Sequence, residues 1–392
     1  MNRPVALEVP PTLADRAARV AAVAAEHAAA VDREGRFPAE TFAAAKAAGL
    51  MSLLHPVRTG GEGRSVSEVA EVCYLLGQAC GSSGLIFAMH QIMTACVTRH
   101  FEGSEWHAAF LRRAAAEQWL LASSTTEGAK RDMRSSDAPL VTEAGVVRLD
   151  RDASVISYGL ETDVIVTLAR RAPEAAASDQ VLLVISRDNY TLTPSQSWDT
   201  LGMRGTCSQG FALKAEADPA QVIPTPYSDI HIQTMTPCAH LLWSSVWAGI
   251  AASAVERARR FIRKAAAAAG EPPPAAVHLT RAQASLRALR ALVAAALARF
   301  EAVDGDPKAM GTMEYQTSIN LLKVDASELA VAAVMSALRA CGLAGYRNDG
   351  DWTLGRHLRD VLSSPIMISN ERILANLAST SLMSETPKTL KG

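Results

Sequence analysis

The sequence predicts an α+β fold in which a β-domain separates two helical domains. Two observations predict it. Apolar residues recur at helical spacing before residue 118 and again after residue 235, whereas the apolar runs between residues 119 and 215 are short and flanked by Asp, Gly, Ser and Pro. We expect an N-terminal helical domain over 1–118, a middle β-domain over 119–227 and a C-terminal four-helix bundle over 228–392.

The first third has the start and stop signals of helices. Thr12 with Asp15, and Ser65 with Glu68, have the spacing of a capping box and precede Ala/Val/Leu periodic runs. Pro38 and Gly49 bound the run FPAETFAAAKAAG, with proline in the first turn and glycine just past the end. Further helices are expected at 86–99 and 105–117.

The middle segment has the pattern of strands. Its apolar runs are WLLASS, GVVRLD, DVIVTLA, QVLLVIS and GFALKA, which begin at residues 119, 145, 163, 180 and 210. Helical spacing then returns at 239–269, 279–302, 313–341 and, more briefly, after Pro365. The run GEPPP at 270–274 cannot continue a helix and predicts the turn between the first two of these helices.

Composition excludes several classes of function. The formal net charge is −1 and basic residues form no concentrated stripe, which argues against a nucleic-acid partner. No apolar run reaches the roughly 20 residues of a membrane span. No export signal is visible, so a cytoplasmic protein is expected. The scattered cysteines have no metal-ligand spacing, so we expect reduced thiols and no metal site; they are Cys73, Cys80, Cys96, Cys207, Cys238 and Cys341.

Four motifs follow one another along the chain: HPVRTGGEG (55–63), SSTTEGAKRD (123–132), WDTLGMRGTCS (198–208) and LGRHLRD (354–360). From about residue 12 to 381, their order and spacing resemble the acyl-CoA dehydrogenase superfamily, whose members hold FAD against a thioester or a similar substrate. The resemblance implies this family's three-domain fold, an oxidoreductase flavoprotein and a homotetramer or homodimer.

The resemblance also implies where the cofactor and substrate bind. Thr125 and Thr126 match a loop at the flavin pyrimidine edge, and Ser157 matches the hydroxyl at flavin N5. Arg339 replaces a glutamine that meets the dinucleotide of a neighbouring subunit. Gly342 and Asn370 complete the expected cofactor residues. FAD is the expected cofactor, or FMN if the protein is a monooxygenase.

Two arginines are candidates for substrate binding. Arg131, beside Lys130, favours an anionic ligand or a reduced flavin, although both cations also suit a solvated surface turn. Arg204 suits a ligand-facing cation, or it pairs with an acid from a neighbouring strand.

The base that a dehydrogenase needs is missing from its usual places. After the Arg-Asp pair the family carries a Glu-Gly-Thr loop, and here Ile368 stands at the position of the glutamate. The family's second location aligns with Ala239. A relocated base is therefore expected at His240 or Glu371, although a histidine in the setting of His240 is more often a packed core residue.

Three interpretations remain. The leading one is α,β-dehydrogenation of an acyl thioester, on coenzyme A or a carrier protein, with electrons passed to an electron-transfer flavoprotein. The alternative is a monooxygenase supplied with reduced flavin by a separate reductase, which needs no glutamate; the absence of a histidine shortly after the Arg-Asp pair counts against it. The third is a non-catalytic subunit that binds thioesters or other small molecules.

Overall fold

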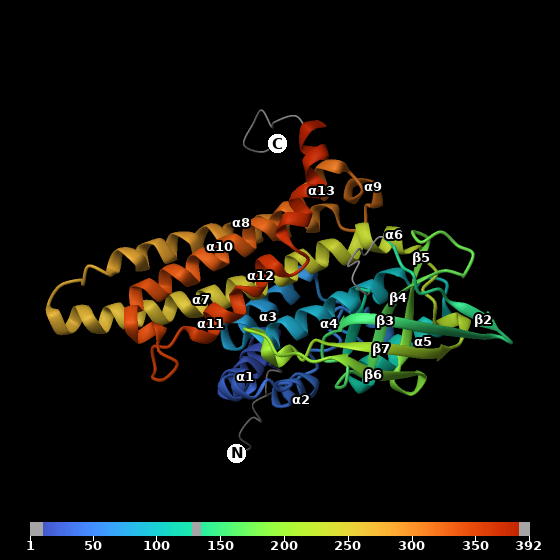
Figure 1. Cartoon of the computed structure of the whole chain (residues 1–392), viewed down its shortest axis with the longest axis horizontal. Coiled ribbons are helices and arrows are strands. Elements are labelled where there is room, and N and C mark those ends of the chain that lie inside the picture. Colours follow the sequence, from blue (N-terminus) through green and yellow to red (C-terminus); the bar gives the residue numbers. More distant parts are fainter. Residues whose placement is uncertain (1–10, 128–134, 384–392) are drawn as a thin grey trace, which may run out of the picture.

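The computed structural model describes residues 11–127 and 135–383 and has the predicted α+β architecture (Figure 1). Five helices come first, then seven strands, then the long C-terminal helices. The first group is α1 Leu13–Glu34, α2 Ala39–Ala47, α3 Val66–Ala79, α4 Gly81–His100 and α5 Glu105–Glu117.

Both predicted capping boxes are present. Thr12 Oγ1 accepts a hydrogen bond from the Asp15 amide, and the Asp15 carboxylate accepts one from the Thr12 amide, at 3.2 and 3.0 Å. Ser65 and Glu68 repeat the arrangement at the start of α3. Each box satisfies two of the amides that a helix start leaves unpaired.

The strands form two sheets. One has the order β1-β4-β5, with β1 parallel to β4, and the other has the antiparallel order β2-β3-β7-β6. The strands are β1 Leu121–Ser124, β2 Val141–Glu143, β3 Val146–Ile156, β4 Val164–Arg170, β5 Gln180–Ser186, β6 Tyr190–Gln196 and β7 Gln209–Ala217. β6, at the edge of its sheet, was not predicted because it is polar and contains Pro194.

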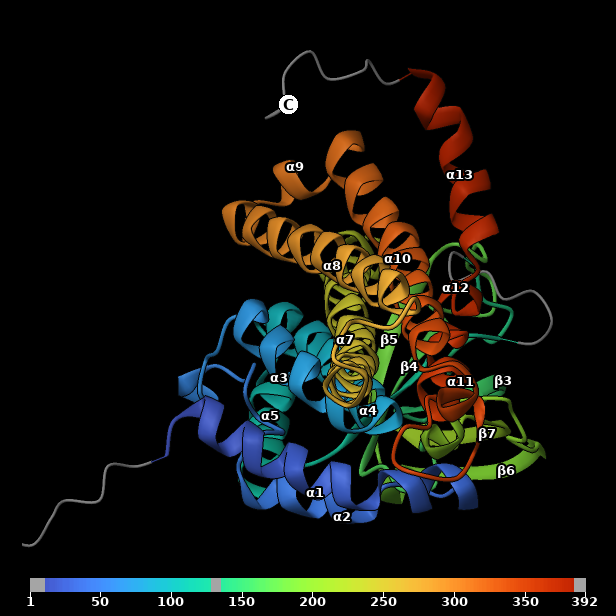
Figure 2. The same cartoon turned by 90° about the vertical axis from the view of Figure 1, so that its left-hand side faces the viewer.

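The C-terminal helices surround α7. Figure 2 looks along this helix, with α8 and α10 on one side and α3 and α4 on the other. The elements are α6 Tyr227–Ile230, a π-helical turn His231–Met235, α7 Thr236–Ala269, α8 Ala276–Val303, α9 Pro307–Met310, α10 Met313–Tyr346, α11 Gly355–Val361, α12 Ser363–Ile366 and α13 Asn370–Met383. The expected domain boundaries fall between α5 and β1 and inside α6.

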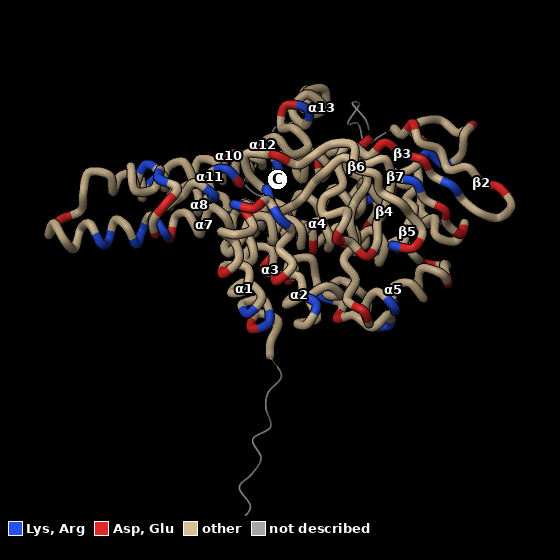
Figure 3. Tube along the Cα trace, turned by 60° about the horizontal axis from the view of Figure 1, so that its bottom comes forward, with Lys and Arg blue, Asp and Glu red and all other residues tan. Residues whose placement is uncertain are grey.

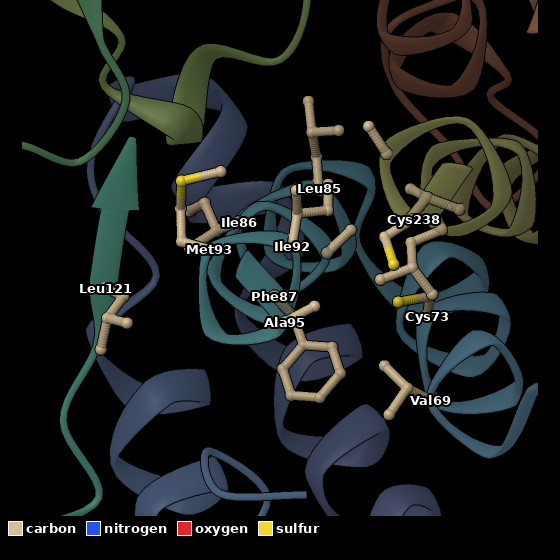
Figure 4. Packing of buried hydrophobic residues seen from close by; sticks show 14 of the residues in the cluster. Val69, Cys73, Leu85, Ile86, Phe87, Ile92, Met93, Ala95, Leu121 and Cys238 are labelled. Atoms are coloured by element: carbon tan, nitrogen blue, oxygen red, sulfur yellow. The ribbon is translucent and has the colours of Figure 1, made fainter. Parts of the chain in front are cut away.

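The core joins the helices to the β-domain through α4. In Figure 4, α4 lies between Leu121 of β1 on one side and Cys73 of α3 with Cys238 of α7 on the other. The six cysteines form no disulfide, and all of them except Cys207 are buried.

The surface charge is mixed. Acidic and basic positions are scattered over most of the chain in Figure 3. One basic run follows the outer part of α7, namely Arg257, Arg259, Arg260, Arg263 and Lys264.

By length and composition, the helical segments Tyr227–Ala269 and Met313–Tyr346 could each cross a membrane. The apolar window of the first is 89 % buried inside the protein, as expected of a core helix, and that of the second is 39 % buried. The expectation of no membrane partner stays a prediction.

Candidate functional site

A chain of hydroxyl groups connects the end of β3 to the turn at 198–208. Ser157 Oγ lies 2.8 Å from Ser208 Oγ, and Ser208 Oγ lies 2.7 Å from Thr206 Oγ1. Thr206 Oγ1 donates to the Met203 carbonyl at 2.8 Å. Because a carbonyl only accepts and each hydroxyl has one proton, Thr206 must accept from Ser208 and Ser208 from Ser157. Half-buried Ser157 therefore presents an acceptor at the open end of the chain.

The 198–208 turn is fixed to α11 and α1. The Met203 amide donates to Asp360 Oδ1 at 2.7 Å. Arg359 Nη1 donates to the Leu201 carbonyl at 2.9 Å, and the same guanidinium forms an ion pair with Asp32 of α1. The backbones pack so closely that a Cβ on Gly202 would lie 2.1 Å from the Arg359 carbonyl oxygen. Glycine is therefore required at position 202.

Asp360 is an unusual acid. Its side chain is 3 % exposed, and burial raises its pKa to about 6, although the hydrogen bond from Met203 acts in the opposite direction. The ion pair with Asp32 raises the pKa of Arg359, so this guanidinium stays charged. The Arg-Asp pair thus positions the 198–208 turn.

The loop after β1 is held from beneath by a buried arginine. Thr125 and Thr126 are half-buried and lead into Glu127. The Glu127 carboxylate lies 3.3 Å from Arg151 Nη1 and accepts a hydrogen bond of 2.7 Å from Ser136 Oγ. Arg151 has no exposed side-chain surface, and burial lowers its pKa. Arg131 lies outside the described residues.

Arg204 is occupied by protein groups. Its Nε donates to the Asp32 carbonyl at 2.8 Å, and its Nη1 donates to Asp199 Oδ1 at 3.2 Å and to the Thr200 carbonyl at 3.1 Å. The acid it pairs with, Asp199, lies in the same turn and not on a neighbouring strand. Its substrate role stays a prediction.

The turn that follows α12 has unusual backbone angles. Ile368 and Ser369 have φ of 59° and 56°, in the left-handed region that a β-branched residue strongly disfavours. Asn370 is buried and bonded to α10 through Lys323, Ser327 and Glu328. Its amide is thus engaged within the protein, and its cofactor role stays a prediction.

The two candidate bases have different surroundings. His240 is buried, its Nδ1 donates to the Ile319 carbonyl at 2.9 Å, and burial lowers its pKa to about 4. Glu371 is exposed, accepts from Ser369 Oγ at 3.0 Å, and has a pKa lowered chiefly by a backbone hydrogen bond. Neither pKa is near neutrality, where a general base is most effective.

The remaining candidates lie near the end of α10. Arg339 is exposed, and Gly342 introduces a kink with φ 55° and no atom within 4 Å of a Cβ placed there. A surface recess between α7 and α8 contains none of the predicted site residues. It is lined by Ala252, Val255, Glu256, Arg259, Gln283, Leu286, Arg287, Arg290 and Ala291.

The sequence motifs did not indicate the buried cations Arg151 and Lys323. In both cases the apolar periodicity contained the signal, since each lies on the buried face of its own element. Among the described residues, no group of three or more His, Cys, Asp or Glu side chains is arranged to hold a metal ion.

Comparison with known proteins identifies the relatives of this chain. The family model of the acyl-CoA dehydrogenase N-terminal domain matches residues 12–118, and that of the C-terminal domain matches residues 239–382. L-evernosamine nitrososynthase of Micromonospora sp. is 30 % identical over 89 % of this chain and 83 % of its own. A probable FMNH2-dependent monooxygenase, SfnC of Pseudomonas putida, is 24 % identical over 83 % of this chain and 84 % of its own.

A solved structure has the same fold. FMN-bound TdsC from Paenibacillus sp. A11-2 superposes with a TM-score of 0.82 at 21 % identity, covering 96 % of this chain and 98 % of its own.

Proposed function

The chain belongs to the acyl-CoA dehydrogenase family, and from that membership we propose that it is a flavin-dependent monooxygenase supplied with reduced flavin by a separate reductase. This is the alternative rather than the leading interpretation of the sequence. Reduced flavin, when bound, supplies two electrons with which one atom of O2 enters the substrate and the other leaves as water.

The observation that carries the proposal is the direction of the hydroxyl chain. Ser157 matches the family position at flavin N5, and its proton is committed to Ser208. Ser157 Oγ can therefore accept a hydrogen bond, and reduced flavin carries a hydrogen on N5 whereas oxidised flavin has only a lone pair there. The Ser157 acceptor thus fits a reduced flavin better than an oxidised one.

The two positions where the family carries its base hold Ile368 and Ala239, which supports the same choice. Dehydrogenation requires removal of an α-proton. Ile368 has no ionisable group, and His240 with a pKa of about 4 is neutral but a very weak base. An oxygen transfer needs no such residue, because the electron pair comes from the substrate.

The relatives suggest the cofactor and the substrate class. SfnC is named a probable FMNH2-dependent monooxygenase, another relative L-evernosamine nitrososynthase, and TdsC a dibenzothiophene monooxygenase. We therefore propose FMN rather than FAD, and a small substrate with a nucleophilic nitrogen or sulfur atom. The nitrogen or sulfur lone pair forms the new bond to oxygen.

The expected partners follow from this proposal. A flavin reductase replaces the electron-transfer flavoprotein as the redox partner. A cytoplasmic homo-oligomer remains our proposal, supported by large apolar side chains left exposed on α10 to α13: Leu343, Tyr346, Ile366 and Leu382 are 73, 73, 76 and 90 % exposed.

The test begins with anaerobic titration of the protein with oxidised and reduced FMN and FAD. We expect reduced FMN to bind at least tenfold more tightly than oxidised FMN. The complex is then mixed with oxygen and a panel of primary amines, aminosugars and thioethers, and products are sought 16 mass units heavier than the substrate.

The other interpretations predict different results. A bound oxidised flavin that is bleached by acyl-CoA without oxygen would establish the dehydrogenase. No affinity for either flavin in folded protein would leave the non-catalytic subunit.

A further inference from the structure

Lys323 is a buried cation that forms no direct ion pair with a carboxylate of the described residues. Its side chain has no exposed surface, and no carboxylate of the described residues lies within 4.0 Å of its Nζ. The centroid of the Trp247 ring lies 5.8 Å from Nζ. Burial disfavours the charge of Lys323 more than the carboxylates of Glu371 and Glu328 favour it, so its presence calls for a reason other than stability.

The ammonium holds both ends of the turn after α12. Lys323 Nζ donates to Asn370 Oδ1 at 2.7 Å and to the Pro365 carbonyl at 3.4 Å. The other end of the Asn370 amide donates to Ser327 Oγ and to Glu328 Oε1, both at 3.0 Å. The segment from 365 to 370 is thereby attached to α10 by side-chain contacts.

Between these two attachments lie the disfavoured backbone angles. Ile368 and Ser369 are both left-handed, and neither is glycine or asparagine. Such a conformation persists only where the surroundings fix it. The contacts of Lys323 and Asn370 supply that constraint.

The turn continues directly from the elements that fix the candidate site. Asp360 of α11 holds Met203, and α12 leads from α11 to Pro365. We propose that Lys323 is a positioning residue, whose ammonium holds the Pro365–Asn370 turn as a wall of the substrate pocket. The role as a pocket wall rests on the proposed function, whereas the attachment of the turn does not.

The charge of Lys323 changes within an accessible pH range. Burial lowers its pKa to about 8, and the carboxylates of Glu371 and Glu328 oppose that shift. The ionisable groups that face it are Glu328 of α10, Glu371 of α13 and His240 of α7, and burial keeps His240 neutral above pH 5. Near pH 8, then, loss of the Lys323 proton is the titration that alters the attachment of the turn.

The pH dependence of global stability distinguishes a positioning role of Lys323 from a purely stabilising one. Between about pH 8 and pH 10, the folded protein has lost the proton that the unfolded chain keeps, so this group adds stability as the pH rises. Over the same range the hydrogen bonds to Asn370 and Pro365 lose their charge and weaken. Global stability and the order of the turn must change in opposite directions.

The experiment compares the full-length wild type with Lys323→Met, Lys323→Arg and Asn370→Ala, and uses Lys308→Met, at an exposed lysine of α9, as the control. Hydrogen–deuterium exchange is measured for residues 366–373 from pH 6.5 to 9, as a ratio to Lys308→Met at each pH. Thermal unfolding is measured alongside. The fraction of reduced FMN that yields oxygenated product gives the functional readout.

At pH 7 we expect Lys323→Met and Asn370→Ala to raise exchange in this segment at least tenfold, without lowering the melting temperature of Lys323→Met. Lys323→Arg should stay within threefold of wild type and lack the rise in exchange that wild type shows above pH 8. Product yield per reduced flavin should fall at least fivefold in Lys323→Met and in Asn370→Ala.

The outcomes are separable. Unchanged exchange in Lys323→Met and Asn370→Ala overturns the proposal whatever the enzyme does. Increased exchange with an unchanged product yield refutes the role as a pocket wall. If wild type forms no oxygenated product but the exchange results hold, the monooxygenase proposal fails and the attachment by Lys323 stands.

Discussion

Asp360 of α11 and Met203 of the β-domain turn are joined by a hydrogen bond of 2.7 Å across 157 positions of sequence. The acceptor is a buried carboxylate whose pKa is raised to about 6. The hydrogen bond therefore depends on a carboxylate that is charged at neutral pH, although burial disfavours that charge.

Asp360→Asn tests this cost. The mutation keeps an oxygen acceptor for Met203 and removes the charge, so we expect it to raise the free energy of unfolding at pH 7.5. A shift from 3.8 to about 6 is roughly two pKa units, or about 3 kcal/mol as an upper value.

A raised pKa of Asp360 means that the folded protein takes up the proton before the unfolded chain does as the pH falls. The stability advantage of Asp360→Asn should therefore shrink between pH 7 and pH 4. Denaturant unfolding at several pH values measures it, with exposed Asp351→Asn as the control; a pH-independent difference would contradict the assignment.

Ser157→Ala tests the hydroxyl chain. Loss of one acceptor should weaken binding of reduced FMN by about tenfold, or roughly 1.4 kcal/mol, and affect oxidised FMN less. Ser157→Thr retains the hydroxyl and should bind normally. Ser208→Ala releases the Ser157 proton, so we expect a smaller preference for reduced over oxidised FMN. Anaerobic titration measures all three, and an unaltered preference in Ser208→Ala would show that the direction of the chain does not matter.

Glu127→Gln tests the support of the loop after β1. Arg151 is fully buried, and Glu127 is the carboxylate paired with it. Removing the negative charge should cost about 3–5 kcal/mol, because it leaves an uncompensated buried cation. Arg151→Met, which removes that cation, should cost clearly less. Equal losses of stability in the two variants would indicate that packing, rather than charge, governs this position.

His240→Asn distinguishes a core histidine from a relocated base. With its pKa lowered to about 4, His240 stays neutral in the folded protein while the unfolded chain takes up a proton below about pH 6.5. Its contribution to stability is thus present above pH 6.5 and is lost as pH falls toward 4, and the variant should be less sensitive to acid over this range. Product formation should change less than threefold, whereas loss of a catalytic base would cost about a hundredfold or more. Half-exposed His27→Asn is the matched control.

The architecture was predictable where the sequence contains local signals. The capping boxes at Thr12 and Ser65 and the turn at 270–274 all occur where they were expected. The helix expected at 313–341 extends to Tyr346 because Gly342 allows a kink rather than an end. Edge strand β6 was missed because five of its seven residues face solvent and it contains Pro194.

The site was less predictable, because it depends on contacts between distant segments. Arg151 lies on the same inner face of β3 as Val147, Leu149 and Ala153. Because side chains two positions apart in a strand point to the same face, this spacing predicts that Arg151 is buried. Lys323 lies on the same face of α10 as Ile319, Ala326 and Ala330. Periodicity can thus show that a cation is buried, but its partner comes from the fold: Glu127 for one and Asn370 for the other.

The attachment of the 198–208 turn also determines when the site can form during synthesis. Its outer anchors are Asp32 on one side and Arg359 with Asp360 on the other, and Arg359 and Asp32 are 327 positions apart. Two segments so far apart in the sequence can pair only after both have left the ribosome. A nascent chain that has passed Ala217 but not reached Asp360 therefore contains every strand of the β-domain and yet cannot close the turn beside Ser157. The turn closes only once Asp360 has emerged, when the strands and most of the hydrophobic core are already available.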